Sequence, residues 1–157
     1  MRRVWWAAAA LLVAGCGVQP TGVTDGGEAP TGVAPGATLY FVDASGELRP
    51  QQRDTGGLGS ISEALALLLA GPGGSGMRTE IEPVSVQRVG VVIEPGVIEL
   101  VTPLTAEDVT PLGVDQIVCT ALSTHVQSGG AQDTRVRVRF TMPTPQTEEL
   151  RTCPLIT

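Results

Sequence analysis

The chain has 157 residues, a formal net charge of −6 and no lysine, so that all ten of its basic residues are arginine. Scattered arginines in an acidic chain exclude the basic stripe with which proteins usually contact nucleic acid. The absence of lysine excludes Schiff-base chemistry and a P-loop, and the length suffices for one domain.

The first residues have the pattern of an export signal. Arg2 and Arg3 precede an apolar run over 4–13, and small residues follow this run up to Cys16. Gly15 interrupts the apolar segment well short of the ~20 residues that a membrane-spanning helix needs. We therefore expect export with cleavage near Cys16 rather than a transmembrane helix.

The end of this segment, Val13-Ala14-Gly15-Cys16, resembles the lipobox of bacterial lipoproteins. The resemblance implies that 1–15 is a signal peptide, that the Cys16 thiol carries a diacylglyceryl group and that the new amino terminus is acylated, as by palmitate. Two or three such chains anchor a protein stably. The protein would then lie at the cell membrane, facing the extracytoplasmic side. The alternative is an ordinary secretory signal with an incidental cysteine.

A tether is predicted between this cysteine and the folded domain. Residues 17–36 consist mostly of Gly, Pro, Thr and Val and show no periodicity, which is typical of a flexible linker. Removing 1–15 leaves 8 arginines against 16 acidic residues, a mature charge of about −8. We expect the lipidated Cys16 and its linker over 16–36, a folded domain over 37–142 and a C-terminal tail over 143–157.

The domain is predicted to begin with a hairpin. Residues 39–42 are an apolar run with aromatic and β-branched side chains, 43–46 contain the turn residues Asp, Ser and Gly, and 47–49 continue the chain beyond the turn. A second hairpin is predicted where apolar runs over 84–94 and 97–102 flank Pro-Gly. A two-residue loop there would place four apolar residues on one face, although Pro-Gly favours a type II turn, which suits a tight hairpin poorly. These four are Val91, Ile93, Ile98 and Leu100.

Two helices are predicted from capping residues and apolar spacing. Ser60 and Glu63 have the spacing of a capping box, and this first helix should end at Gly71-Pro72. Thr110 followed by proline fits the start of a second helix. The apolar positions are Ile61, Ala64, Leu65 and Leu68 in the first helix, and Val114, Ile117, Val118, Ala121 and Leu122 in the second.

Residues 135–140 alternate arginine with apolar side chains, which predicts a half-buried strand with Val136, Val138 and Phe140 facing the core. The prolines beyond Met142 predict an irregular tail. Together the elements predict an α+β fold in which a mixed or antiparallel sheet of four or five strands packs on two helices.

Lipidation of Cys16 would leave two further cysteines. A disulfide between Cys119 and Cys153 is the simplest pairing in an oxidising compartment, where it would add roughly 3 to 4 kcal/mol. The alternative is a buried Cys119 and a free Cys153. We favour the disulfide, because an exposed thiol outside the cell is a liability.

Three segments are similar to the GerMN domain, first described in spore germination and sporulation proteins. They are Leu39-Tyr40-Phe41-Val42-Asp43, the helix from Glu63-Ala64-Leu65 to Leu68-Leu69-Ala70-Gly71-Pro72, and Gln116-Ile117-Val118-Cys119-Thr120-Ala121-Leu122. The similarity spans roughly 37–141. It departs from the family at 81–83, where Ile-Glu-Pro stands in place of an Ile-Pro-x-Gly step.

This resemblance implies a membrane-tethered envelope protein with a binding or scaffolding module and no catalytic residues. It implies a role in sporulation, germination or envelope signalling, with an envelope protein or wall component as partner. The abundance of Ala, Gly, Val and Arg beside the absence of Lys indicates a high-GC genome, and we expect an actinobacterial source.

The residues offer little for catalysis or for a cofactor. His125, near the end of the second helix, is better explained by the helix dipole than as a general base. Ser75 lies in a glycine-rich loop without a neighbouring base, and the cysteines and the histidine lack the spacing of a metal site. We predict no enzyme activity, no metal and no cofactor.

Two alternative functions remain open. A small cell-wall hydrolase could draw a carboxylate pair from Glu80, Glu82, Glu94 and Glu99, and the alternative takes Glu94 and Glu99 as that pair. A small-ligand-binding lipoprotein of a transporter would require a sizeable pocket.

The arginines of the alternating strand also allow two interpretations. Arg135, Arg137 and Arg139 could contact anionic lipid headgroups or wall polymers, or they could form the solvated side of an amphipathic strand, which we favour.

Overall fold

The computed structural model describes residues 36–156, except the side chains of residues 146 and 147. The predicted signal segment, Cys16 and the predicted linker lie outside the described residues, except Gly36, which already belongs to the first strand. Neither of the α-helices in the described residues combines the length and the hydrophobicity of a bilayer-spanning segment.

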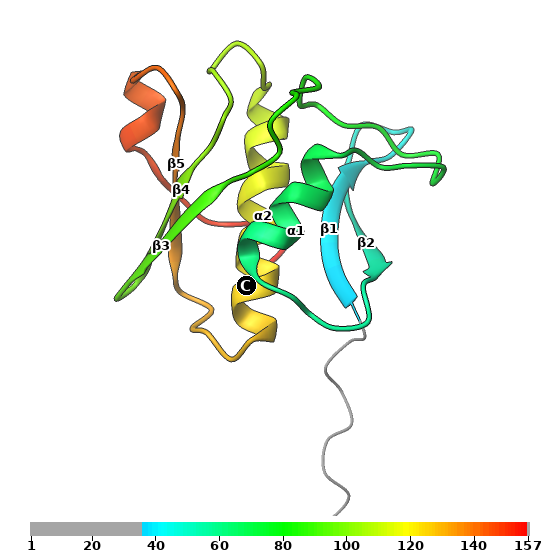
Figure 1. Ribbon diagram of the computed structural model, residues 1–157, viewed down its shortest axis with the longest axis horizontal. Helices are drawn as coiled ribbons and strands as arrows, with labels where there is room; N and C mark the ends of the chain where they lie inside the picture. Colours follow the sequence, from blue (N-terminus) through cyan, green and yellow to red (C-terminus); the bar gives the residue numbers. More distant parts are fainter. Residues whose placement is uncertain (1–35, 157) are drawn as a thin grey trace, which may run out of the picture. The chain divides into compact units, whose positions relative to one another are not determined.

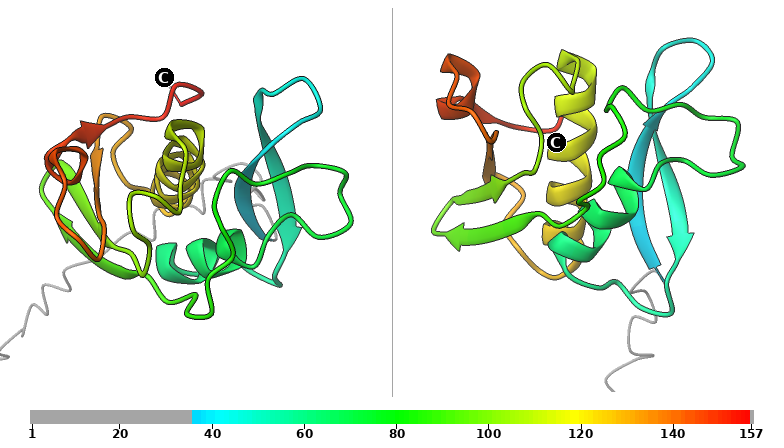
Figure 2. Two further views of the ribbon diagram at one scale, coloured as in Figure 1. Left: turned by 90° about the horizontal axis from the view of Figure 1, so that it is seen from above. Right: turned by 45° about the horizontal axis from the view of Figure 1, so that its top comes forward.

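The domain is α+β, as predicted, and its helices lie between two sheets (Figures 1 and 2). The two helices are α1 (Ile61–Leu69) and α2 (Pro111–Gln127). β1 (Gly36–Val42) and β2 (Leu48–Asp54) form a hairpin sheet. β3 (Gly90–Glu94), β4 (Val97–Val101), β5 (Arg135–Arg139) and β6 (Leu150–Arg151) form a four-stranded mixed sheet, and α2 contacts both sheets through β1 and β5.

β1 stays apart from the larger sheet because α2 and a loop occupy its second edge. The Tyr40 N–H donates to the Thr120 hydroxyl at 3.1 Å, and the Gln116 amide donates to the Tyr40 carbonyl at 2.9 Å. Further along the strand, Val42 forms a backbone bridge with Arg78. Buried backbone groups need partners, and here side chains and a loop supply them in place of a strand.

In the larger sheet the strand order is β3-β4-β5-β6, and only β4 and β5 run parallel. A parallel pair requires a long crossover connection, which contains α2. Val136, Val138 and Phe140 are buried, as the alternating pattern predicted.

The hairpin of β3 and β4 has the predicted two-residue loop. Glu94 pairs with Val97 and Ile93 with Ile98, and Gly96 adopts the positive φ of 76° that a type II turn requires. The four apolar residues therefore share a face. The first strand begins only at Gly90, and Ile93 is 60% exposed because the tip of the hairpin extends beyond the core.

Both predicted helix starts are confirmed. The Ser60 hydroxyl accepts from the Glu63 N–H, while the Glu63 carboxylate accepts from the Ser60 N–H, which completes a capping box. Thr110 caps α2 by accepting from the Gly113 N–H. α1 ends before Gly71, whose φ is +94°, as the Gly-Pro pair predicted.

The C-terminal tail is more ordered than its prolines indicated. It contains a short 3-10 helix, η1 (Pro145–Glu148), and β6, which adds to the sheet beside β5. The prediction of an irregular tail is therefore wrong for 145–148 and 150–151, whereas the disulfide of Cys153 holds the tail against α2. Prolines are tolerated here because β6 is a short edge strand that lies between them.

Candidate functional site

Cys119 and Cys153 form the predicted disulfide, with their Cα atoms 4.8 Å apart. Both residues are buried, and the bond joins the middle of α2 to the tail that follows β6. The alternative of a free Cys153 is therefore wrong. Cys16 is the one cysteine of the sequence that takes no part in this bond.

Two of the three arginines of β5, Arg137 and Arg139, form ion pairs with acidic side chains. Parallel pairing of β4 with β5 places Glu99 opposite Arg137, and its carboxylate lies 3.5 Å from Arg137 and 3.2 Å from Arg139. Glu148 lies 3.9 Å from Arg137. Arg135 is exposed at the start of β5. These ion pairs favour the solvated-strand interpretation over contact with an anionic surface.

The ion pairs of Glu99 make this residue a less suitable catalytic carboxylate for the hydrolase alternative. Glu94 and Glu99 lie on one face of the open sheet, because alternate residues of paired strands share a face. Glu99 is engaged by two guanidinium groups, and Glu94 is exposed near the hairpin tip. Glu80 is paired with Arg78 and accepts from the Thr110 hydroxyl, and Glu82 is exposed.

His125 occupies the last turn of α2, where we expected it. Its Nε2 lies 3.1 Å from the Thr134 hydroxyl, and the ring packs so closely on Gly130 that a β-carbon there would displace the imidazole. The histidine thus links the end of α2 to the segment before β5, through a hydrogen bond to Thr134 and through packing on Gly130. Among the described residues, no group of three His, Cys, Asp or Glu side chains could hold a metal ion.

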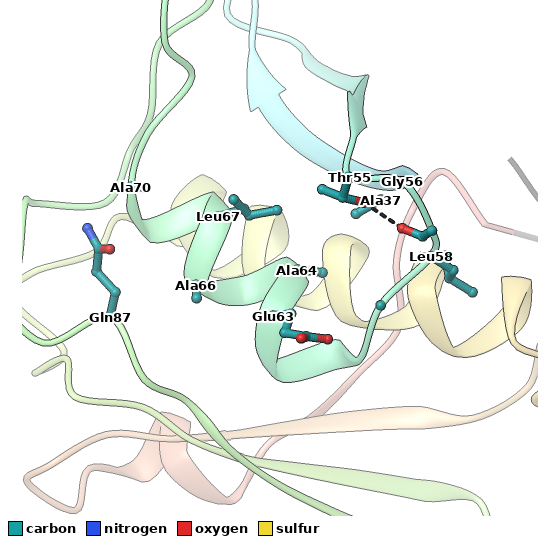
Figure 3. A pocket seen from close by; sticks show the side chains of 12 residues that line it. Ala37, Thr55, Gly56, Leu58, Glu63, Ala64, Ala66, Leu67, Ala70 and Gln87 are labelled. Atoms are coloured by element: carbon teal, nitrogen blue, oxygen red, sulfur yellow. Dashed lines mark hydrogen bonds between the residues drawn. The ribbon is translucent and has the colours of Figure 1, made fainter. Parts of the chain in front are cut away.

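A pocket of about 570 Å³ opens beside α1 (Figure 3). Its walls come from the first residues of β1, the loop after β2 and the outer side of α1. The lining residues are Ala37, Thr55, Gly56, Gly57, Leu58, Gly59, Glu63, Ala64, Ala66, Leu67, Ala70 and Gln87.

The pocket is mainly apolar and has one charged group. Small side chains such as Ala66 and Ala70 leave space along the helix, and Leu58 and Leu67 supply apolar walls. The Glu63 carboxylate accepts from the Ser60 N–H at 2.7 Å and from the Ser60 hydroxyl at 2.8 Å. The backbone bond, followed by the hydroxyl bond, holds the pKa of Glu63 below its ordinary value, so the pocket carries a negative charge at neutral pH.

Sequence reasoning missed this pocket, because its walls come from separate segments. Ala37, residues 55–59, the lining positions of α1 and Gln87 meet only when β1, α1 and the loops pack together. The available signal was the pair of small residues Ala66 and Ala70 on the less buried side of an otherwise leucine-rich helix, after a glycine-rich loop.

No protein-family model, curated protein or solved structure matches this chain.

Proposed function

We propose that the protein is a lipoprotein anchored to the cell membrane through Cys16, facing the extracytoplasmic side, with a non-catalytic GerMN-like binding or scaffolding domain. The observation that carries the proposal is the buried disulfide between Cys119 and Cys153. Disulfides persist in oxidising compartments, so this bond supports export. It also leaves Cys16 as the remaining thiol, at the position where the lipobox pattern places the lipid.

A binding role fits the way in which the candidate catalytic groups are used. Two arginines engage Glu99, and His125 contacts Thr134 at the end of α2. We propose an envelope protein or a wall component as the partner, in sporulation, germination or envelope signalling.

Membrane fractionation of the full chain tests the anchor. Cys16→Ser should move the protein out of the membrane fraction, because no thiol remains to accept the diacylglyceryl group. The matched control is the double variant Cys119→Ser/Cys153→Ser, which should stay in the membrane fraction. Retention of Cys16→Ser in the membrane would show that the anchor lies elsewhere.

A wall-degradation assay tests the non-catalytic assignment. We expect no difference between the protein and its Glu94→Gln/Glu99→Gln variant. Loss of a measured wall-degrading activity in that variant, with an intact circular dichroism spectrum, would refute a binding-only role.

The pocket beside α1 favours a second candidate function, the binding of a small apolar ligand. Its volume of about 570 Å³ lies within the range of about 300 to 1,000 Å³ that is usual for ligand sites. The charge of Glu63 would favour a cationic or hydrogen-bond-donating end on the ligand.

Native mass spectrometry of the protein purified from its own envelope tests this candidate. A bound small molecule should be present in the protein and lost from Ala66→Trp, which fills the pocket. It should be retained in Ala131→Trp, which adds the same side chain at an exposed position outside the lining. An unliganded wild-type protein would contradict the candidate.

A further inference from the structure

β3 is an edge strand with an open side. It lies at the end of the strand order β3-β4-β5-β6 and pairs only with β4. The two-residue loop makes Glu94 and Val97 a hydrogen-bonded pair, so the backbone groups of Glu94, Val92 and Gly90 face β4. Those of Val91 and Ile93 face away from it. In the described part of the chain they have no backbone partner on that side.

The side chains of this edge are apolar and exposed. Val92 is 49% exposed and Ile93 60% exposed, on opposite faces of the strand. Natural proteins usually protect such edges with charges, prolines or bulges, because unpaired backbone groups recruit another strand. The β3 edge has Pro95 only beyond its end, and no charged residue within 89–93.

We propose that β3 pairs antiparallel with β3 of a second copy of this chain, about a twofold axis at Val92. In this register Val91 lies opposite Ile93 of the second copy, and each such pair exchanges two backbone hydrogen bonds. Every free backbone group of Val91 and Ile93 is then used. The inference goes beyond the proposed function, since it does not depend on the lipid anchor or on the GerMN resemblance.

Opposite charges at the two ends of β3, on Arg88 and Glu94, favour antiparallel pairing with a second copy of the chain. Arg88 precedes the apolar stretch and Glu94 ends it, and neither side chain has an ion pair within the described residues. Antiparallel pairing places Glu94 opposite Gly90 of the second copy and diagonal to its Arg88, within reach of a long side chain. A parallel arrangement would bring like charges together. The edge is thus complementary to itself, as a twofold interface requires.

A hollow beside β3 supplies a place for a side chain of the second copy. It has a volume of about 390 Å³ and lies between β3, the start of α1 and the end of α2, with Val91, Ile93, Ser62, Thr124 and His125 among its lining residues. In the proposed register, Ile93 of the second copy lies next to Val91 on this same face. Its side chain would therefore enter the hollow, which accounts for an isoleucine exposed on the core-facing side of the sheet.

Cysteine crosslinking of the full chain in its own cells, whether or not the protein is attached to a membrane, tests the proposal. Val92 would face Val92 of the second copy in a non-hydrogen-bonded pair, with Cα atoms ~4.5 Å apart, within the ~4.4 to 6.8 Å that a disulfide spans. Under mild oxidation Val92→Cys should therefore form a covalent dimer on a non-reducing gel. The matched control is Val101→Cys. Val101 is also 49% exposed and lies on the same sheet face as Val92, but on the inner strand β4.

Charge reversal provides a second, independent readout. In the Val92→Cys background, Arg88→Glu or Glu94→Arg should each lower the yield of dimer about fivefold, because like charges then meet at both ends. The double reversal Arg88→Glu/Glu94→Arg should restore the yield. Restoration distinguishes a specific pairing from an effect on folding.

Three outcomes would overturn the proposal. Val92→Cys could crosslink no better than Val101→Cys, or it could crosslink to a different protein in place of a second copy. Finally, Val91→Cys could crosslink where Val92→Cys does not, which would require another register.

Discussion

The side-chain amide of Gln116 in α2 donates a hydrogen bond to the backbone carbonyl of Tyr40 in β1 at 2.9 Å, across 76 positions of sequence. The carbonyl of the same side chain accepts from the backbone N–H of Glu80 at 2.8 Å. Gln116 is fully buried, with 0% exposure. One polar side chain thus joins α2 to a strand and to a loop, in a region where water could not replace it.

We expect Gln116→Leu to lower the free energy of unfolding by ~2 to 4 kcal/mol. The substitution leaves two backbone groups unpaired, and each such group costs ~1 to 3 kcal/mol when buried. Urea unfolding followed by circular dichroism measures the loss. Gln132→Leu, at an exposed position, is the matched control and should change stability by less than ~0.5 kcal/mol. Equal losses in the two variants would contradict the role of Gln116.

Reduction of the disulfide should lower the free energy of unfolding by roughly 3 to 4 kcal/mol. The bond closes a loop with a sequence separation of 34, and the cost of releasing it follows from the entropy that the unfolded chain gains. Urea unfolding with and without dithiothreitol measures the difference. Cys119→Ala/Cys153→Ala should be insensitive to the reductant, and sensitivity of this variant would assign the effect to something other than the bond.

Gly113→Ala should destabilise the protein by ~1 to 3 kcal/mol, as overpacking usually does. Helix propensity alone would predict a gain of ~1 kcal/mol for alanine in α2. However, a β-carbon at Gly113 would lie 2.3 Å from the Glu80 carbonyl oxygen, so backbone must move. Thermal unfolding compares it with Gly74→Ala, where nothing lies within 4 Å. A stabilised Gly113→Ala would show that this contact is not tight.

The turn of the first hairpin should lose stability only in acid. The Ser45 hydroxyl, the Glu47 N–H and Arg49 hold the pKa of Asp43 well below its ordinary value. Because this pKa is lowered on folding, the stabilisation is fully present above the unfolded pKa of ~3.9 and is lost as the pH falls from there toward the folded pKa.

Asp43→Asn tests this dependence. The difference in unfolding free energy between the protein and this variant should stay constant from about pH 7 to pH 5 and should shrink below about pH 4. Urea unfolding at several pH values measures it, with Asp133→Asn at an exposed position as the control. A difference that already falls between pH 7 and pH 5 would assign the dependence to another group.

The sequence by itself determined the local elements, because their signals lie within a few residues of one another. Ser60 and Glu63 specify the start of α1, and Pro95-Gly96 specifies the loop between β3 and β4. The alternation over 135–140 specifies the buried side of β5. The disulfide was predictable from the number of cysteines together with the expectation of export.

Only the tertiary structure decided how these elements combine. The sequence predicted one sheet on two helices, but Gln116 and Thr120 occupy the edge of β1, so its hairpin stands apart from the four-stranded sheet. Glu99 meets Arg137 and Arg139 because parallel pairing joins strands almost 40 residues apart. The pocket beside α1 and the open edge of β3 likewise depend on which segments pack together, and no local pattern of residues encodes such long-range contacts.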